Sequence, residues 1–448
     1  MKSEYYKNSQ IHALLMGWKR PPWKLYGHSL LTGVLAGGVV VGYRILLDRI
    51  SAYRTAMQGL LLGWVAVLFL CSFGIGWLIH KYPMIRGSGI PQLKGVLLRK
   101  MEFHWFPELI AKFIGGIAAI GCGLSLGREG PSIQMGAYVG DGVSAVSKYT
   151  HSERRYLLTA GASAGLAAAF NAPLAGVLFA VEELHKNISP RMLTCSFLGS
   201  IGGEVVSKYV FGLQPIFNFH LFSYLPVSKY PILIGLGILC GIGGVLFTRA
   251  LLFALDIHDR YIRNDLFRPL PILLLAGVLG LFLPQVLGGG HELILSSTGE
   301  QYGAQFLLLI LVGKFIFTSL SYGTGAPGGI FFPLLVIGAL LGRLYSDMLV
   351  QFFSWDYEYK INFIILGMTA FFSAVVQAPI TGSILLAEMV GSLQHFTSLV
   401  TVSAVAYISA ELFHTRPIYE VFLYRLLRTR TPHNLQNQYP TSSHRPNL

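Results

Sequence analysis

The sequence has 448 residues, of which 53% are hydrophobic and only 12% are charged. A set of soluble domains is excluded, because about a quarter of the residues in soluble proteins are charged. No charged residue occurs from Thr55 to Ile79, a stretch long enough to cross the roughly 30 Å hydrocarbon layer of a bilayer as a helix. The composition therefore predicts a membrane protein with many spans.

The formal net charge of +13 lies largely in the two ends and the loops. Basic side chains gather at Lys2, Lys7, Lys19, Arg20 and Lys24, and again at Arg416, Arg425, Arg428 and Arg430. Basic residues that flank membrane spans tend to stay in the cytoplasm, so we expect both termini there. The basic residues form no stripe or motif typical of nucleic-acid binding, and the first residues lack the pattern of a cleaved secretory signal.

Apolar segments follow one another along the chain, and several are too short to span a bilayer. We expect them near residues 29–47, 55–80, 107–126, 131–147, 156–184, 192–212, 229–256, 269–287, 303–320, 328–350, 361–376, 379–394, 396–413 and 417–427. Many of the 51 glycines and 21 prolines lie at segment ends, a pattern typical of broken or re-entrant helices. The four cysteines lie inside apolar runs without the spacing of a zinc site or a disulfide framework: Cys71, Cys122, Cys195 and Cys240.

Two stretches of the chain repeat one another. Residues 171–182, NAPLAGVLFAVE, line up with residues 377–388, QAPITGSILLAE, with Ala, Pro, Gly and Glu at matching places. The Gly-x-x-x-Pro form of residues 127–131 recurs at residues 329–333, in the same order and at nearly the same distance. Repeats in transporters are often inverted, so that broken helices of both halves meet near the bilayer midplane.

We therefore predict an all-α polytopic membrane protein with two inverted-topology repeats and many tilted, broken and re-entrant helices. Its predicted parts are a cytoplasmic N-terminal segment at residues 1–28, a first transmembrane repeat at 29–213, a second at 214–428, and a short polar cytoplasmic tail at 429–448.

The glycine-to-proline turns at residues 127–131 and 329–333 predict an anion site. The first N–H groups of a helix have no intrahelical acceptor, and the helix dipole adds partial positive charge at that end. Proline suits the first turn because it lacks an N–H, and glycine lets the chain bend sharply before it. Such helix ends attract an anion weakly enough for it to leave again. A third turn, residues 87–91, adds the Ser88 hydroxyl as a donor.

Glu129 stands out within the first turn, because its carboxylate would compete with the anion for the same N–H groups. A protonated Glu129 would lose its hold and move aside, which would couple anion entry to proton binding. The simpler alternative is a glutamate that only satisfies the helix dipole. Glu182 matches Glu388 in the second repeat and so indicates shared architecture, whereas Glu183 faces Met389 and is the better functional candidate.

A serine protease is the alternative from another class of proteins. Residues 161–165, GASAG, fit the Gly-x-Ser-x-Gly pattern of serine hydrolases, with Ser163 as the nucleophile. The surrounding run from Ala160 to Ala169 consists of small residues, which close helix packing in lipid requires. The histidines near the apolar segments lie at segment ends or in loops, so packing is the favoured interpretation.

Together these motifs resemble the CLC family of chloride channels and chloride/proton antiporters. The resemblance runs from Gly87 to Tyr419 and rests on motifs in a fixed order: GSGIP at 87–91, GREGP at 127–131, GLAAAFNAPLAGVLFAVEE at 165–183, GAPGGIFFP at 325–333 and RPIY at 416–419. It implies that the hydroxyls of Ser88 and Tyr419 and the backbone N–H groups of Ile330 and Phe331 bind the central anion.

The same resemblance implies the proton-handling residues. Glu129 matches the gating glutamate of the family, which occupies the outer anion site when ionised, held by amides around Arg128 and Gly130. Glu183 matches the inner proton-transfer glutamate, with Glu182 beside it at the cytoplasmic portal. Family members of this kind are homodimers with one anion pathway in each subunit, so we expect a homodimer.

Two residues refine the expected subtype. Ser88 favours chloride, since nitrate-preferring relatives tend to have proline there, and Glu183 favours antiport over a passive CLC-type channel. The tail is too short for the paired CBS domains of many eukaryotic relatives, which is typical of the prokaryotic form. We expect a multi-pass inner-membrane protein that exchanges chloride for protons as a secondary active transporter. It would not be an enzyme and would need neither cofactor nor metal.

Overall fold

The structure is a computed structural model that describes residues 22–57, 61–187, 189–217, 219, 225–299 and 301–430. In these ranges the chain is helical and forms no strand. Most of the predicted segment 1–28 and of the predicted tail 429–448 lies outside them. The first described helix begins at Trp23, inside the segment that we expected to precede the first apolar span.

The described residues as far as 211 form eight α-helices, a 3-10 turn and one π-helical turn. They are α2 (Trp23–Met57), α3 (Leu61–Lys81), η1 (Pro83–Ile85), α4 (Ile90–Leu97), α5 (Trp105–Gly121), α6 (Glu129–Val146), α7 (His151–Phe170), α8 (Pro173–Phe179), the π-helix η2 (Ala180–His185) and α9 (Pro190–Phe211).

The described residues from 225 onward form nine α-helices and three short 3-10 turns. They are η3 (Val227–Lys229), α10 (Pro231–Tyr261), α11 (Leu270–Phe282), η4 (Pro284–Val286), α12 (His291–Ser297), α13 (Ala304–Gly323), α14 (Phe331–Phe353), η5 (Tyr357–Tyr359), α15 (Lys360–Val376), α16 (Pro379–Val390), α17 (Phe396–Leu412) and α18 (Ile418–Arg430).

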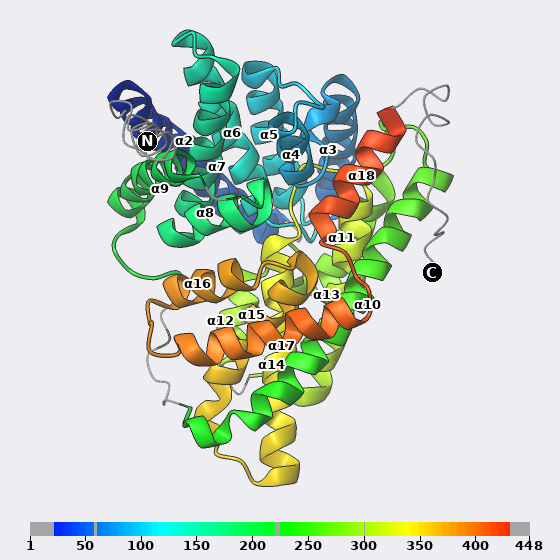
Figure 1. The fold of residues 1–448 in the computed structure, drawn as a ribbon. Coiled ribbons are helices and arrows are strands. Elements are labelled where there is room, and N and C mark those ends of the chain that lie inside the picture. The colour runs from blue at the N-terminus through cyan, green and yellow to red at the C-terminus, as the bar shows by residue number, and fades with distance from the viewer. Residues whose placement is uncertain are drawn as a thin grey trace, which may run out of the picture.

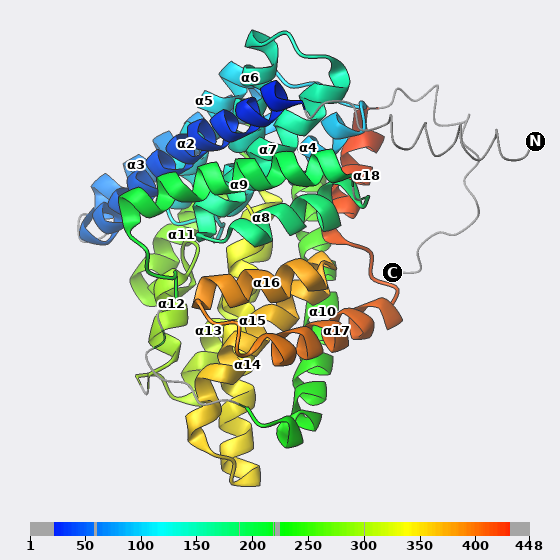
Figure 2. The ribbon, with the colours of Figure 1, turned by 60° about the vertical axis from the view of Figure 1, so that its left-hand side comes forward.

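The helices are arranged as two bodies, one above the other in Figure 1. Helices α2–α9 form the upper body in Figure 1, and most of α12–α17 form the lower one; Figure 2 shows the same division from another side. Helix α18 returns to the upper body, where it packs against α4, and α8 packs against α16 across the boundary. The boundary that we placed near residue 213 stays a prediction.

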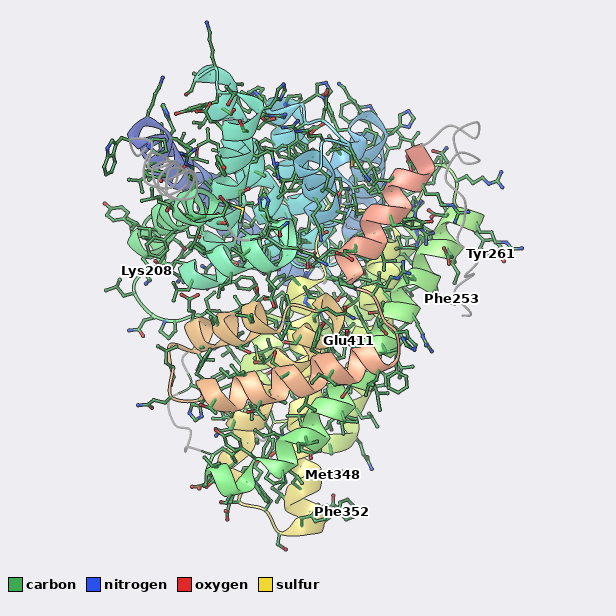
Figure 3. All side chains as sticks on the ribbon, viewed as in Figure 1. Lys208, Phe253, Tyr261, Met348, Phe352 and Glu411 are labelled. Carbon is green, nitrogen blue, oxygen red and sulfur yellow. The ribbon has the colours of Figure 1, made fainter. Side chains whose placement is uncertain are left out.

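Helices long and apolar enough to cross a bilayer support the predicted membrane location. Six of them lie in the described ranges: Trp23–Arg54, Gly63–Lys81, Pro231–Tyr261, Ala304–Gly323, Phe331–Phe353 and Tyr357–Val376. Large apolar side chains such as Phe253 and Phe352 project from the outside of the bundle, as Figure 3 shows. Such exposure suits lipid as the solvent. The predicted fold class, an all-α polytopic membrane protein, is confirmed.

Broken helices occur at matching places in the two repeats. The apolar segment that we placed at 156–184 is not one helix, because Asn171 adopts a left-handed backbone conformation and ends α7 before Pro173 begins α8. Gln377 and Pro379 separate α15 from α16 in the same way. Proline cannot continue a helix, so the repeated Asn/Gln-Ala-Pro motif breaks each span.

Small residues allow α6 and α7 to touch through their backbones. A Cβ atom on Gly136 would overlap the carbonyl oxygen of Gly161, and a Cβ atom on Gly161 would overlap that of Gly136. Gly338 and Gly367 make the same reciprocal contact between α14 and α15. Ser163 is buried in this layer, and its hydroxyl has no hydrogen-bond partner among the described residues. The run of small residues therefore packs helices together, as we expected.

This packing predicts opposite effects of one substitution at two helical glycines. Gly136→Ala should lower the free energy of unfolding by about 1–3 kcal/mol, because the new methyl group overpacks a backbone contact. Gly42→Ala is the matched control: Gly42 has nothing within 4 Å of its Cβ position, so alanine should raise stability by up to about 1 kcal/mol. Unfolding titrations in mixed micelles measure both, and equal effects would contradict the packing argument.

Candidate functional site

The two glycine-to-proline turns of the repeats are joined to each other. The backbone N–H of Gly127 donates to the carbonyl of Gly329 at 2.7 Å, and the N–H of Gly329 donates back to Gly127 at 2.8 Å. This pair is the isolated antiparallel bridge of the described chain. Helix α6 begins directly after the first turn at Glu129 and α14 after the second at Phe331, so both helix N-termini lie at one junction.

The third turn is bonded into the same junction. The N–H of Gly87 donates to Gly325 at 3.1 Å, and the N–H of Gly328 donates to the carbonyl of Gly87 at 3.0 Å. The fully buried ammonium group of Lys112 donates to the carbonyls of Ile85 and Gly87, at 2.8 and 2.6 Å. These bonds hold the turn in place and leave its helix, α4, free to direct its N-terminus at a ligand.

The predicted anion donors lie on the elements that meet there. A Cβ atom on Gly130 would be 2.9 Å from that of Ser88, so the first turns of α6 and α4 are in contact. Ile330 caps α14, whose first residue, Phe331, is fully buried. The Ser88 and Tyr419 hydroxyls are buried in the protein and have no partner among the described residues. Unsatisfied buried hydroxyls are rare in proteins, so these two donors are available to a ligand.

Glu129 lies at the boundary between this junction and a cavity. Its side chain is 1% exposed, and its Oε2 atom has no hydrogen-bond partner among the described residues. Arg128 Nε lies 3.9 Å from Glu129 Oε1. A Cβ atom on Gly127 would overlap Glu129 Oε2 and lie 3.2 Å from the backbone nitrogen of Phe332. The second repeat therefore brings an amide beside this carboxyl group, in addition to the amides that we expected around Arg128 and Gly130.

The cavity next to Glu129 has a volume of about 860 Å³. Its charged lining includes Arg44, Asp48, Arg54, Arg128 and Glu292. Arg128 Nη1 donates to Asp48 at 3.1 Å, whereas two guanidinium nitrogens of Arg44 and two of Arg54 are buried without partners among the described residues. Unpaired guanidinium groups attract anions, so the cavity is a suitable approach to the junction.

Glu183 lies at the other end of the site, on the π-helical turn η2. Its side chain is 1% exposed and accepts a hydrogen bond of 2.7 Å from Lys94 Nζ, on α4, which is itself 5% exposed. Lys94 was not among the residues predicted from the sequence. The available signal was a lysine within the short apolar stretch that follows residues 87–91, although nothing in that stretch identified its partner.

Glu182 makes a different set of contacts from Glu183. Its carboxylate accepts hydrogen bonds from the backbone of Ile380 and Thr381, at 3.2 and 2.7 Å, at the start of α16. Glu388 bonds in the same way to Leu174 N and Ala175 N at the start of α8, at 3.0 and 2.8 Å. Each glutamate thus caps a helix of the other repeat, which fits the shared architecture that we inferred from their alignment. The part of Glu182 in proton transfer stays a prediction.

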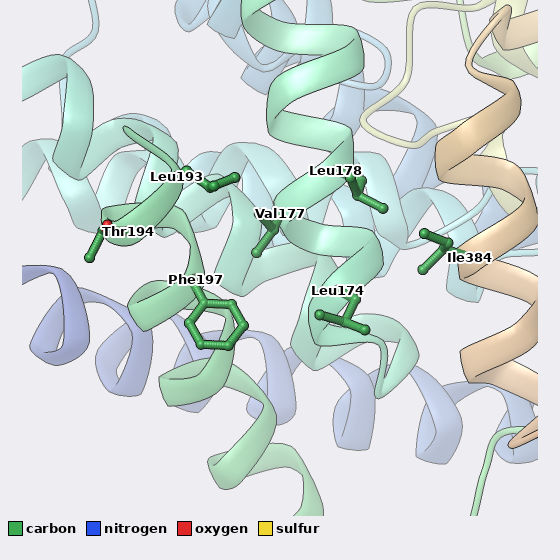
Figure 4. A pocket seen from close by; sticks show the side chains of 7 residues that line it. All are labelled: Leu174, Val177, Leu178, Leu193, Thr194, Phe197 and Ile384. Atoms are coloured by element: carbon green, nitrogen blue, oxygen red, sulfur yellow. The ribbon is translucent and has the colours of Figure 1, made fainter. Parts of the chain in front are cut away.

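A second pocket, in addition to the cavity next to Glu129, is apolar. It lies where α8 and α9 of the first repeat approach α16 of the second, as Figure 4 shows, and its lining consists of Leu174, Val177, Leu178, Leu193, Thr194, Phe197 and Ile384. One threonine hydroxyl among apolar side chains cannot hold a small anion, so this groove is separate from the candidate site.

The reciprocal helix caps predict that substitution of either glutamate lowers the stability of the protein by a similar amount. Glu182→Ala and Glu388→Ala should each lower the free energy of unfolding by about 1.5–3 kcal/mol, because each removes hydrogen bonds between a carboxylate and backbone donors. Exposed Glu411 is a control, and Glu411→Ala should change stability by less than about 0.5 kcal/mol. Unfolding titrations in mixed micelles give the comparison. Unchanged stability for Glu182→Ala would show that its bonds contribute little.

Comparison with known proteins places the chain in a family. The model of the family described as voltage gated chloride channel matches residues 69–411. The H(+)/Cl(-) exchange transporter ClcA of Vibrio cholerae serotype O1 (strain M66-2) is 35% identical over 430 residues, which cover 92% of this chain and 91% of that protein.

Solved structures agree with this match. A slow cyanobacterial Cl-/H+ antiporter superposes with a TM-score of 0.86 at 30% identity, covering 92% of this chain and 99% of that one. A CLC-type fluoride/proton antiporter has a TM-score of 0.75 at 24% identity, over 88% of this chain and 98% of that one, which supports the fold alone. The fold and the site thus define a membrane ion-transport protein. The chain belongs to the voltage gated chloride channel family, the CLC family.

Proposed function

We propose that this protein is a secondary active transporter that exchanges chloride for protons. The observation that carries the proposal is the pair of buried hydroxyls of Ser88 and Tyr419, which have no hydrogen-bond partner among the described residues. Ser88 lies two residues before α4, and α4 packs against α18, the helix of Tyr419. Two buried carboxyl groups, Glu129 and Glu183, are the proposed gate and the proposed proton carrier. Relatives named as chloride/proton exchangers add support.

Chloride binds between the repeats in this proposal. Ser88 and Tyr419 donate their hydroxyl protons, and the N–H groups of Ile330 and Phe331 supply the helix end. Chloride loses its hydration shell on entering, and several weak donors replace it without the tight hold of a full positive charge. The reciprocal bonds between Gly127 and Gly329 hold the donors in position before the ion arrives, so no ordering cost arises when it binds.

Glu129 acts as the gate. When ionised, its carboxylate stands in for an anion beside the amides around Arg128 and Gly130 and the backbone N–H of Phe332. When protonated, it has no net charge to hold it there and moves into the adjoining cavity, so chloride takes its place. The same proton is the one exchanged, since Glu129 collects it from the cavity side and passes it inward when it returns.

Glu183 transfers protons between this gate and the other side of the membrane. Its burial isolates it from bulk water, and the side chain of Glu182 lies beside it at the expected cytoplasmic portal. A passive CLC-type channel is the alternative function, and proton coupling separates the two. An intramembrane protease using Ser163 has little support, because α6 and α7 use the residues around it for backbone contact.

The expected assembly is a homodimer with one pathway in each subunit, in an inner membrane with both termini in the cytoplasm. The apolar groove of Figure 4 contains Leu174 and Phe197, both exposed, and offers a surface for a second copy. Cross-linking between cysteines placed at Phe197 in native membranes tests this assembly. Neither cofactor nor metal enters the proposed cycle.

Transport coupling is tested in liposomes loaded with chloride. A chloride gradient should drive protons uphill through the unmodified protein. Glu129→Gln and Glu183→Gln should each reduce proton movement by roughly a hundredfold, the usual effect of removing a proton-transfer group. Chloride flux should persist in the Glu183→Gln variant. Glu411→Gln is the control, since that glutamate is exposed, and it should keep full coupling. Chloride flux without proton movement in the unmodified protein would favour the channel instead.

Chloride binding tests the two hydroxyl donors. Ser88→Ala and Tyr419→Phe should each weaken chloride binding by roughly tenfold, because each removes a hydrogen bond to a charged ligand. Tyr424→Phe, on the same helix as Tyr419 but 68% exposed, is the matched control and should bind normally. Isothermal titration with chloride provides the measurement. Normal binding by both donor variants would remove the hydroxyls from the site.

A further inference from the structure

The ion pair between Lys94 and Glu183 is a buried pair of full charges close to the anion site. The two charged atoms lie 2.7 Å apart, and the side chains are 6% and 2% exposed. Lys94 belongs to α4, the helix that starts two residues after Ser88, and α4 packs against both η2 and α18. The pair therefore connects the helix that begins beside one proposed chloride donor with the proposed proton carrier.

Other charged and titratable groups face Glu183 from each neighbouring element. Helix α18 contributes Tyr419 and Glu420. Lys186, just after η2, forms an ion pair with Glu420 in which both side chains are more than a third exposed. His185 is turned to α7, where its ring bonds to Thr159 Oγ1 at 2.8 Å. Lys94 is thus the buried cation that directly contacts Glu183.

A proton carrier of this kind conflicts with anion binding. An ionised carboxyl group repels chloride, and in a low-dielectric interior the repulsion between like charges extends over many ångströms. Glu183 must nevertheless be ionised during part of any cycle in which it passes on a proton. Without a counter-charge, chloride would bind more weakly whenever the carrier is empty.

We infer that Lys94 neutralises Glu183 so that chloride can occupy the Ser88–Tyr419 site while the proton carrier is ionised. Lys94 acts as a positioning residue through Glu183 and is not itself a ligand of the central ion. With Glu183 ionised the pair has no net charge, and with Glu183 protonated it has one positive charge, which favours chloride. Proton uptake and chloride binding therefore support each other. This inference rests on the proposed function.

Measurements of equilibrium chloride binding test the role of Lys94. Every variant also carries Glu129→Gln, so that the proposed gate does not titrate. Lys94→Met should weaken chloride binding by about fivefold at a pH high enough to ionise Glu183 without its partner, because one uncompensated negative charge then remains. At pH 5, where an unpaired ammonium group is charged, Glu183→Gln should bind chloride about fivefold more tightly than Glu183→Gln combined with Lys94→Met.

Two controls separate charge from structure. Lys94→Arg keeps the positive charge and should bind chloride like the background protein, whereas a merely structural need for lysine would weaken binding. Lys186→Met removes a nearby but exposed cation and should have less than half the effect of Lys94→Met on the logarithm of the affinity. Equal affinities of Glu183→Gln with and without Lys94→Met at pH 5, with normal folding, would overturn the inference. Absence of chloride binding by the unmodified protein would instead overturn the proposed function.

Discussion

Unpaired backbone N–H groups inside a bilayer are the constraint on which this structure depends. Apolar surroundings offer no water to satisfy them, so irregular backbone at this depth must bond to protein or face a ligand. The reciprocal bonds between Gly127 and Gly329 satisfy some of these groups and bring the start of α6 beside the start of α14. Both helix ends therefore lie at one junction, and we propose that the N–H groups that remain there form an anion site.

Buried lysines satisfy backbone carbonyl groups in the loops around the site. Lys112 donates to the carbonyls of residues 85 and 87, and Lys314 donates to those of Val286 and Gly288, at 3.1 and 2.7 Å. The two loops also share their left-handed glycines, with φ of 61° at Gly87 and 59° at Gly288. The repeat therefore extends to a loop before α12 that we did not find in the sequence, because its only common letters are glycines.

The two repeats differ in charge at two matching positions, and we propose that these differences account for proton coupling. Glu129 stands where the second repeat has Phe331, and Glu183 stands where it has Met389. Glu182 and Glu388, by contrast, are equivalent and cap equivalent helices. The equivalent glutamates join the two repeats through helix caps, and we propose that the two glutamates without a counterpart handle protons.

The membrane class, the broken helices and the glycine-to-proline turns could be predicted from the sequence, since local composition and backbone preferences set these features. Glu129 and Glu183 were also singled out there, through their mismatch with the second repeat. The pairing of Lys94 with Glu183, a residue 89 positions away, is visible only in the packing of the folded chain. The same holds for the helix that Glu182 caps. Periodicity and turn chemistry act over a few residues, whereas the partner of a buried charge depends on how whole helices pack.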